Sequence, residues 1–146
     1  MLHFSHLLRE LLRKGLIKPL KNVNIKVSYH DPCELARHAG VYDAPREVIK
    51  SLPGIKLQEA KYSREKSRCC GGGGGVLLNY PELAVAGAYN RLSKDILPLG
   101  VEGLVTACPA CYLNFEYAIE RYELPLKLYD ISELLLLTLG DEREEG

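Results

Sequence analysis

The stretch GLVTACPAC, residues 103–111, decides the fold and points to the chemistry of this chain. Residues 103–107 are small, apolar or β-branched, which is typical of a buried strand. A helix is predicted from Pro109 to Tyr122, because proline favours the first turn of a helix. A strand that feeds a helix through a C-x-x-C pair indicates an α/β unit with thiols at the carboxyl end of the strand.

The segments on both sides of this stretch alternate between strand and helix patterns in the same way. Further strands are predicted at 23–29, 55–60 and 126–129, and helices at 5–14, 32–39, 43–51, 81–97 and 132–139. Ser132 is the predicted cap of the last helix. Strands that alternate with helices need crossover connections, so we expect one α/β domain with a mostly parallel four-stranded sheet flanked by helices.

The predicted organisation has three parts: a helix and linker at 1–22, a cysteine-rich domain at 23–140 and a loose charged tail at 141–146. The start of the first helix, LHFSHLL, resembles that of the last, YDISELL, when Ser5 is aligned with Ser132. Two explanations stay open. The similarity is either chance between two amphipathic helices or a sign that the first helix closes an upstream module.

Composition excludes several function classes. Lys plus Arg and Asp plus Glu both number 19, so net charge gives no reason to expect nucleic acid as a partner. No apolar run reaches the roughly 18 residues of a transmembrane helix, and no secretory signal begins the chain. We therefore expect a cytoplasmic, reducing location, peripheral to a membrane complex at most. Five cysteines, an odd number, also argue against a disulfide framework.

The cysteines follow three different predicted strands. Cys33 comes after the first strand, Cys69 and Cys70 after the second, and Cys108 and Cys111 after the third. Because parallel strands end at the same edge of a sheet, all five thiols are expected at that edge, where open α/β sheets bind ligands. A single buried cysteine is often only a small hydrophobic residue, but five at one edge indicate a site.

The local chemistry favours a metal. Cys108 is predicted at a helix N-terminus, which favours the thiolate that binds metals. Two adjacent cysteines can serve one site only if the site is large or the backbone turns sharply, and the glycines after Cys70 permit such a turn. If the metal group is an iron–sulfur cluster, Gly71 and Gly72 are expected to donate backbone N–H hydrogen bonds to its sulfides. A phosphate loop is excluded because Lys-Ser/Thr does not follow the glycines.

The residues around Cys33 have two interpretations. His30 and Asp31 precede it, and they either have a functional role, in which they orient the loop or accept a proton near the site, or cap the turn before Pro32.

These motifs together resemble the cysteine-rich CCG domain found in heterodisulfide reductases. The same domain occurs in the iron–sulfur subunits of glycolate, lactate and glycerol-3-phosphate oxidising complexes. The family pattern is Cys, then Cys-Cys-Gly, then Cys-x-x-Cys; here 35 residues separate Cys33 from Cys69 and 37 separate Cys70 from Cys108. The flanking sequences HDPC, CCGGGG, TACP and YDI also agree, and the chain is most similar to the C-terminal of two copies.

The resemblance implies a cofactor and partners. It implies a [4Fe–4S] cluster that is not a simple cube, bound by all five cysteines: Cys33, Cys69, Cys70, Cys108 and Cys111. It further implies other iron–sulfur or flavin subunits as partners, together with an upstream CCG module. Some family copies bind structural zinc instead, which needs only four thiolates.

Three functions follow as hypotheses. The first is an electron-transfer module, a subunit or fragment of a heterodisulfide reductase-like oxidoreductase. The second is a structural zinc module that docks partner subunits without redox chemistry. The third is a thioredoxin-like dithiol enzyme that uses Cys108 and Cys111, but the pair lies late in the chain and three other cysteines stay unexplained.

Overall fold

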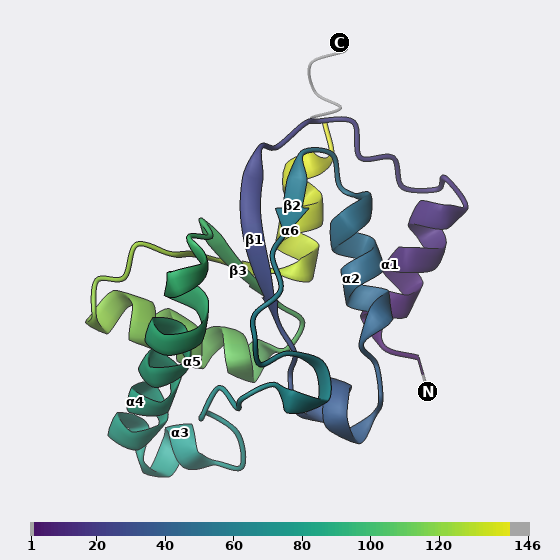
Figure 1. Ribbon diagram of the computed structural model, residues 1–146. Helices are drawn as coiled ribbons and strands as arrows, with labels where there is room; N and C mark the ends of the chain where they lie inside the picture. Colours follow the sequence, from purple (N-terminus) through teal and green to yellow (C-terminus); the bar gives the residue numbers. More distant parts are fainter. Residues whose placement is uncertain (1, 141–146) are drawn as a thin grey trace.

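The computed structural model describes residues 2–140, which form a four-stranded sheet between two layers of helices (Figure 1). The strands are β1 (Ile25–His30), β2 (Ile55–Leu57), β3 (Gly103–Thr106) and β4 (Lys127–Asp130). Their order is β2-β1-β3-β4, and every neighbouring pair is parallel. The predicted α/β class with a parallel four-stranded sheet is confirmed.

The helices divide between the two faces of this sheet. They are α1 (Phe4–Arg13), α2 (Asp43–Ser51), α3 (Val76–Asn79), α4 (Pro81–Arg91), α5 (Pro109–Arg121) and α6 (Ile131–Thr138). We call the face under α1, α2 and α6 the first face, and the face under α4 and α5 the second face (Figure 1). The short α3 precedes α4 and contacts it.

Each face has its own buried cluster, because side chains alternate along a strand. On β1, Val27 and Tyr29 join the cluster of the first face. His30 points the other way and packs against Phe115 of α5. On β3, Val105 belongs to the first face and Leu104 to the second. The sheet is therefore buried on both sides, as crossover connections require.

Several predicted elements differ in length or type. The α-helix predicted to continue to residue 97 ends at Arg91, and π-helical and 3₁₀ turns continue the chain through Leu92–Ile96 and Leu97–Leu99. Pro98 accounts for the end of the helical segment, because it lacks the N–H donor that an α-helix past Leu97 would need. The helix predicted at 32–39 is a π-helical turn, Glu34–His38. The loop expected before residue 76 contains a 3₁₀ turn, and the short α3 was not predicted.

The predicted cap of α6 is wrong. Asp130 is the N-cap, because its backbone is extended and its carboxylate accepts a hydrogen bond from the Ser132 N–H at 2.9 Å. The Ser132 hydroxyl donates to the same oxygen, and the Asp130 N–H donates to the Glu133 carboxylate at 2.8 Å. This capping box lets the helix begin at Ile131, one residue before the predicted start.

The start of α1 repeats this pattern with different side chains. His3 is the N-cap, and its Nδ1 accepts from the Ser5 N–H at 3.1 Å. The Ser5 hydroxyl lies 2.9 Å from the same nitrogen, and the His3 N–H donates to the His6 ring at 3.2 Å. The similarity between the two sequences thus extends to the hydrogen bonds that begin both helices.

The described chain holds α1 against the sheet domain. Leu8 of α1 is buried in the cluster of the first face, and α1 packs along α2. The division at residues 1–22 and 23–140 stays a prediction, and the predicted tail at 141–146 lies outside the described residues. Within residues 2–140, none of the helices is both long and apolar enough to span a membrane.

Candidate metal centre

The five thiols meet in one cavity beyond the carboxyl edge of the sheet. The cavity has a volume of about 540 Å³, and its walls include Cys33, Cys69, Cys70, Cys108, Cys111, Gly71, Gly73 and Gly74. The strand register explains this meeting, because His30 at the end of β1 pairs with Thr106 at the end of β3. The cysteine segments leave the sheet side by side, as expected, and all five thiols are free.

The thiols lie at different depths in this cavity. Cys70 and Cys111 are 3% and 4% exposed and form its inner wall. Cys33 and Cys108 are half-buried, whereas Cys69 is exposed at the rim. The site therefore has an inner pair fixed in the packed core and an outer side that faces solvent.

The glycine loop curls around the sulfurs of the adjacent cysteines. The Gly71 N–H donates to the Cys69 sulfur at 3.3 Å, and the Gly72 N–H donates to the Cys70 sulfur at 3.4 Å. Gly71 has φ +87°, a backbone conformation that glycine adopts without strain. A Cβ at Gly71 would lie 3.0 Å from the Ala84 carbonyl oxygen, so α4 leaves no room for a side chain.

Asn114 on α5 forms hydrogen bonds that hold this loop, and it was not predicted from the sequence. Its Nδ2 donates to the Cys70 carbonyl at 2.7 Å and to the Ala84 carbonyl at 2.9 Å. A Cβ at Gly72 would lie only 2.9 Å from the Asn114 Cβ. The available signal was spacing, since Asn114 follows Cys111 by three residues and so shares its side of the helix.

A buried ion pair ties the loop that leads to Cys69 to the end of β1. Arg46 of α2 donates two hydrogen bonds to Asp31, at 2.7 and 2.8 Å, and its Nε donates to Glu59 at 2.6 Å. The Arg64 backbone N–H also donates to Asp31, at 2.8 Å. Asp31 therefore orients the loop, which is one of its predicted roles, and Arg46 is its unpredicted partner.

A second buried arginine holds the same loop from the α4 side. Arg91 is 1% exposed and donates to Asp95 at 2.8 Å and to the Tyr62 carbonyl at 2.8 Å. Arg68, next to Cys69, lies over the Tyr62 ring and pairs with Asp95 at 3.4 Å. Charged hydrogen bonds thus fix the start of the loop at Tyr62 and Arg64, and the Arg68–Asp95 ion pair lies directly before Cys69.

The inner thiols share a proton network. The Cys111 and Cys69 thiols donate to the Cys70 sulfur, which lowers the pKa of Cys70 far below its usual range. Sharing its single S–H between Cys108 and Cys70 raises the pKa of Cys111, and donation to Cys70 together with burial raises that of Cys69. The arrangement favours one thiolate, on Cys70, stabilised by two neighbouring thiols.

Cys108 is the second thiol with a lowered pKa. A hydrogen bond from the Cys111 thiol, together with backbone N–H groups of Cys111 and Ala110, lowers its pKa to about 6, although partial burial opposes this. Cys108 is the N-cap of α5, and Pro109 follows at the first helical position. The predicted stabilisation of a thiolate at this helix start is thus reproduced by the geometry.

These features suit a thiolate-bound metal group. Thiolates are the soft ligands that iron–sulfur clusters and zinc prefer. Five of them exceed the four that tetrahedral zinc accepts, and backbone N–H groups already point at two sulfurs. The donor set and the cavity therefore fit a multi-iron cluster more completely than a single ion.

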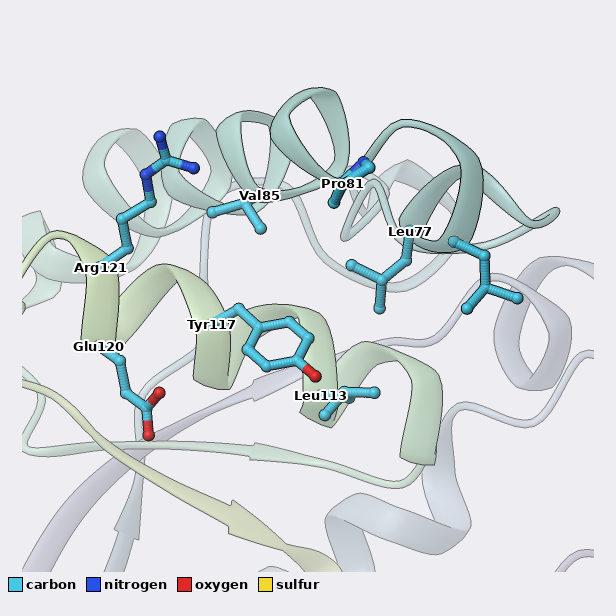
Figure 2. Close-up of a pocket in the computed structure, with 8 residues that line it drawn as sticks. Leu77, Pro81, Val85, Leu113, Tyr117, Glu120 and Arg121 are labelled. Carbon is cyan, nitrogen blue, oxygen red and sulfur yellow. The ribbon is translucent and has the colours of Figure 1, made fainter.

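A second hollow lies next to the site, between α4 and α5 (Figure 2). Its volume is about 640 Å³, and Figure 2 shows Leu77, Val85, Leu113 and Tyr117 around it, with Arg121 at one end. Its lining contains no cysteine. This apolar groove is thus separate from the thiol cavity, although residues of α3, which follows the glycine loop, line both.

The fold and the five-thiol site define a class of protein. Residues 27–116 match the CCG family, described as a cysteine-rich domain. Because this match covers more than half of the chain and includes all five cysteines, the chain belongs to the CCG family of cysteine-rich domains.

Individual relatives come from redox complexes. The chain is 40% identical to one subunit of the dihydromethanophenazine:CoB–CoM heterodisulfide reductase of Methanosarcina barkeri, over 95% of this chain and 34% of the relative. It is 36% identical to one subunit of the fumarate reductase (CoM/CoB) of Methanothermobacter marburgensis, over 84% and 24%. A probable iron-sulfur-binding oxidoreductase of Bacillus subtilis is 33% identical, over 99% and 21%. The chain thus spans about a third or less of these relatives.

Proposed function

We propose that the five cysteines bind one iron–sulfur cluster and that the chain is an electron-transfer module of a heterodisulfide reductase-like complex. The observation that carries this proposal is the meeting of all five thiols in one cavity, with backbone N–H groups directed at two of the sulfurs. The names of the relatives, which are iron–sulfur proteins and subunits of reductases, support the same class of function.

We further propose a [4Fe–4S] cluster of non-cubane shape, with Cys33, Cys69, Cys70, Cys108 and Cys111 as its ligands. When bound, such a cluster accepts and returns single electrons. The chain contributes three things to it. The buried Cys70 and Cys111 exclude water from its inner side, Gly71 and Gly72 donate hydrogen bonds to its sulfur ligands, and Cys69 brings it to the molecular surface.

The exposed rim gives the proposed direction of electron transfer. Cys69 faces solvent, whereas the inner thiols face packed side chains of α5. An iron–sulfur or flavin subunit that docks over Cys69 would place its own cofactor nearest to the cluster. The proposed partners are therefore redox subunits of one complex, and an upstream CCG module is a further candidate.

The deciding experiment is metal analysis of the chain purified without oxygen. We expect near four irons and four acid-labile sulfides per chain, with an EPR signal, and loss of both in Cys70→Ser. The matched control is Ser67→Ala, which removes a nearby hydroxyl and leaves every thiol in place. One zinc per chain and no sulfide, even after anaerobic reconstitution with iron and sulfide, would refute the electron-transfer function and favour a structural zinc module.

A further inference from the structure

His30 is a buried histidine directly behind the thiol cavity. It ends β1, is 1% exposed and lies on the second face of the sheet. Its ring meets the ring of Phe115 edge-to-face, with 4.8 Å between centroids and an angle of 82°. Because Phe115 is itself fully buried, the orientation of the His30 ring is fixed by packing.

Neither nitrogen of this ring has a hydrogen-bond partner within the described chain. Both Nδ1 and Nε2 are buried, and each unmet polar group of this kind costs about 1–3 kcal/mol. Such groups are rare in folded proteins and require an explanation. Burial, followed by the nearby charge of Arg91, lowers the pKa of His30 to about 4. An imidazole keeps at least one N–H donor in either protonation state.

The charged groups around His30 already have partners. Arg91 donates to Asp95 and to the Tyr62 carbonyl. Asp31 accepts from Arg46 and from a backbone N–H. The Nε of Arg91 has no partner within the described chain, but a guanidinium only donates, so it cannot accept the N–H of His30. The N–H of His30 therefore needs a different acceptor.

The sulfurs of the inner pair are acceptors that lie close to this ring. A ring nitrogen of His30 and the sulfurs of Cys70 and Cys111 all lie within 4.8 Å of one another. His30 does not line the cavity that all five thiols share. Because it does not line that cavity, it is placed as a supporting residue and not as a ligand.

We propose that His30 is a positioning residue that donates a hydrogen bond to a thiolate of the inner pair when the metal centre is bound, and thereby raises its reduction potential. The inference rests on the proposed function. A hydrogen bond to a ligand sulfur stabilises the more negative, reduced state, so donors of this kind raise the potential of iron–sulfur centres. The bond also satisfies one of the two unmet nitrogens.

Three variants of the full chain test this role. His30→Leu removes both nitrogens at similar volume, whereas His30→Asn and His30→Gln keep an amide N–H near the position of Nδ1 or Nε2. Ser28→Ala is the matched control, because it removes a buried hydroxyl without a partner from the same strand, two residues farther from the carboxyl edge of the sheet. Each protein is reconstituted anaerobically with iron and sulfide, and its midpoint potential and iron content are measured.

We expect His30→Leu to keep its iron and to favour the oxidised state roughly tenfold, which is a downward shift of about 59 mV for one electron. One of the two amide variants should recover most of this shift, and Ser28→Ala should not change the potential. If His30→Leu does not fold, the difference in potential between the two amide variants decides in its place. Equal potentials in all variants would overturn the proposal, and so would loss of iron, because that would make His30 a ligand.

Failure of the proposed function and failure of the role of His30 give different results. If the wild-type chain takes up no iron and sulfide, the electron-transfer function fails, and His30 is tested with cobalt(II) in the thiol site. Loss of a donor makes the thiolates richer in electrons, so the sulfur-to-cobalt absorption band should move to longer wavelength in His30→Leu. An unchanged band would overturn the role of His30 in that case.

Discussion

The two faces of the sheet differ in the side chains that form their buried clusters. On the first face, α1, α2 and α6 cover the strands with an almost entirely aliphatic cluster that includes Val27, Ile49 and Leu134. On the second face, the cluster under α4 and α5 includes two of the five thiols, Cys70 and Cys111. The first face thus holds the domain together, whereas the second face holds the domain and the site with the same side chains.

This difference has a physical cause in the path of the chain. The loop that carries Cys70 turns toward α4 and α5 and is fixed there by Asn114. Helix α5 begins at Cys108 and continues into the core through Phe115. Packing defects on the second face should therefore reach the site, whereas defects on the first face should change stability alone.

The largest test compares a truncation on each face. Phe115→Ala and Ile49→Ala each leave a cavity, and they should lower the free energy of unfolding by about 3–5 and about 2–5 kcal/mol, measured by urea denaturation of the metal-free chain. Only Phe115→Ala should also reduce the iron bound per folded chain after reconstitution, because Phe115 supports His30 and follows the Cys111 turn. Equal iron loss in both variants would remove the distinction between the faces.

Arg46 should be an exception to this difference between the two faces of the sheet. It belongs to α2 on the first face, yet its guanidinium reaches Asp31 and holds the loop before Cys69. Arg46→Met leaves a buried carboxylate without its partner and should cost about 3–5 kcal/mol of unfolding free energy and also weaken iron binding. The matched control, Arg13→Met, removes a more exposed ion pair and should cost less than about 1 kcal/mol. Iron binding at the wild-type level in folded Arg46→Met would show that the loop does not need this pair.

The glycine loop offers a smaller and sharper test on the second face. Gly71→Ala places a Cβ 3.0 Å from the Ala84 carbonyl in a backbone with φ +87°, which should cost about 1–3 kcal/mol and lower iron content. Gly73→Ala has no heavy atom within 4 Å of its Cβ, so it should change stability by less than about 0.5 kcal/mol. Thermal denaturation and iron analysis of both variants check this, and a similar loss in both would contradict the packing argument.

The smallest expected effect is the pH dependence that Cys108 adds to the metal-free chain. Its pKa in the folded state is about 6, against 9.0 for an ordinary thiol. Folding therefore favours the thiolate, and its contribution to stability is complete above pH 9 and lost as pH falls toward 6. Solvent screening keeps this contribution below about 1 kcal/mol. Unfolding free energies of wild type and Cys108→Ser should thus diverge between pH 6 and 9, and a constant difference would contradict the assignment.

The fold and the meeting of the thiols were predictable from the sequence for one reason. Strand and helix patterns alternate, so the strands must be parallel, and residues that follow parallel strands must share an edge. The position of Cys33, Cys70 and Cys108 at this edge follows from the alternation of strands and helices alone. The two helix starts with related sequences were visible too, although the cap of α6 was assigned to Ser132 and belongs to Asp130.

The supporting residues could not be predicted in this way. Asp31 and Arg46 are 15 residues apart in the sequence, and nothing local indicates that they pair. Asn114 binds a carbonyl 44 positions away, and His30 gains its place only when β1 and α5 pack together. Such contacts depend on how elements meet in three dimensions, whereas patterns in sequence report only which elements exist.

The edges of the sheet affect how the molecule can assemble. β2 and β4 are the edge strands and have three and four residues, and each carries an exposed lysine, Lys56 or Lys127. Short edges with a lysine resist the addition of a further strand from another chain. A partner protein is therefore expected to bind through helices and loops, and the sheet should not extend into a larger intermolecular sheet.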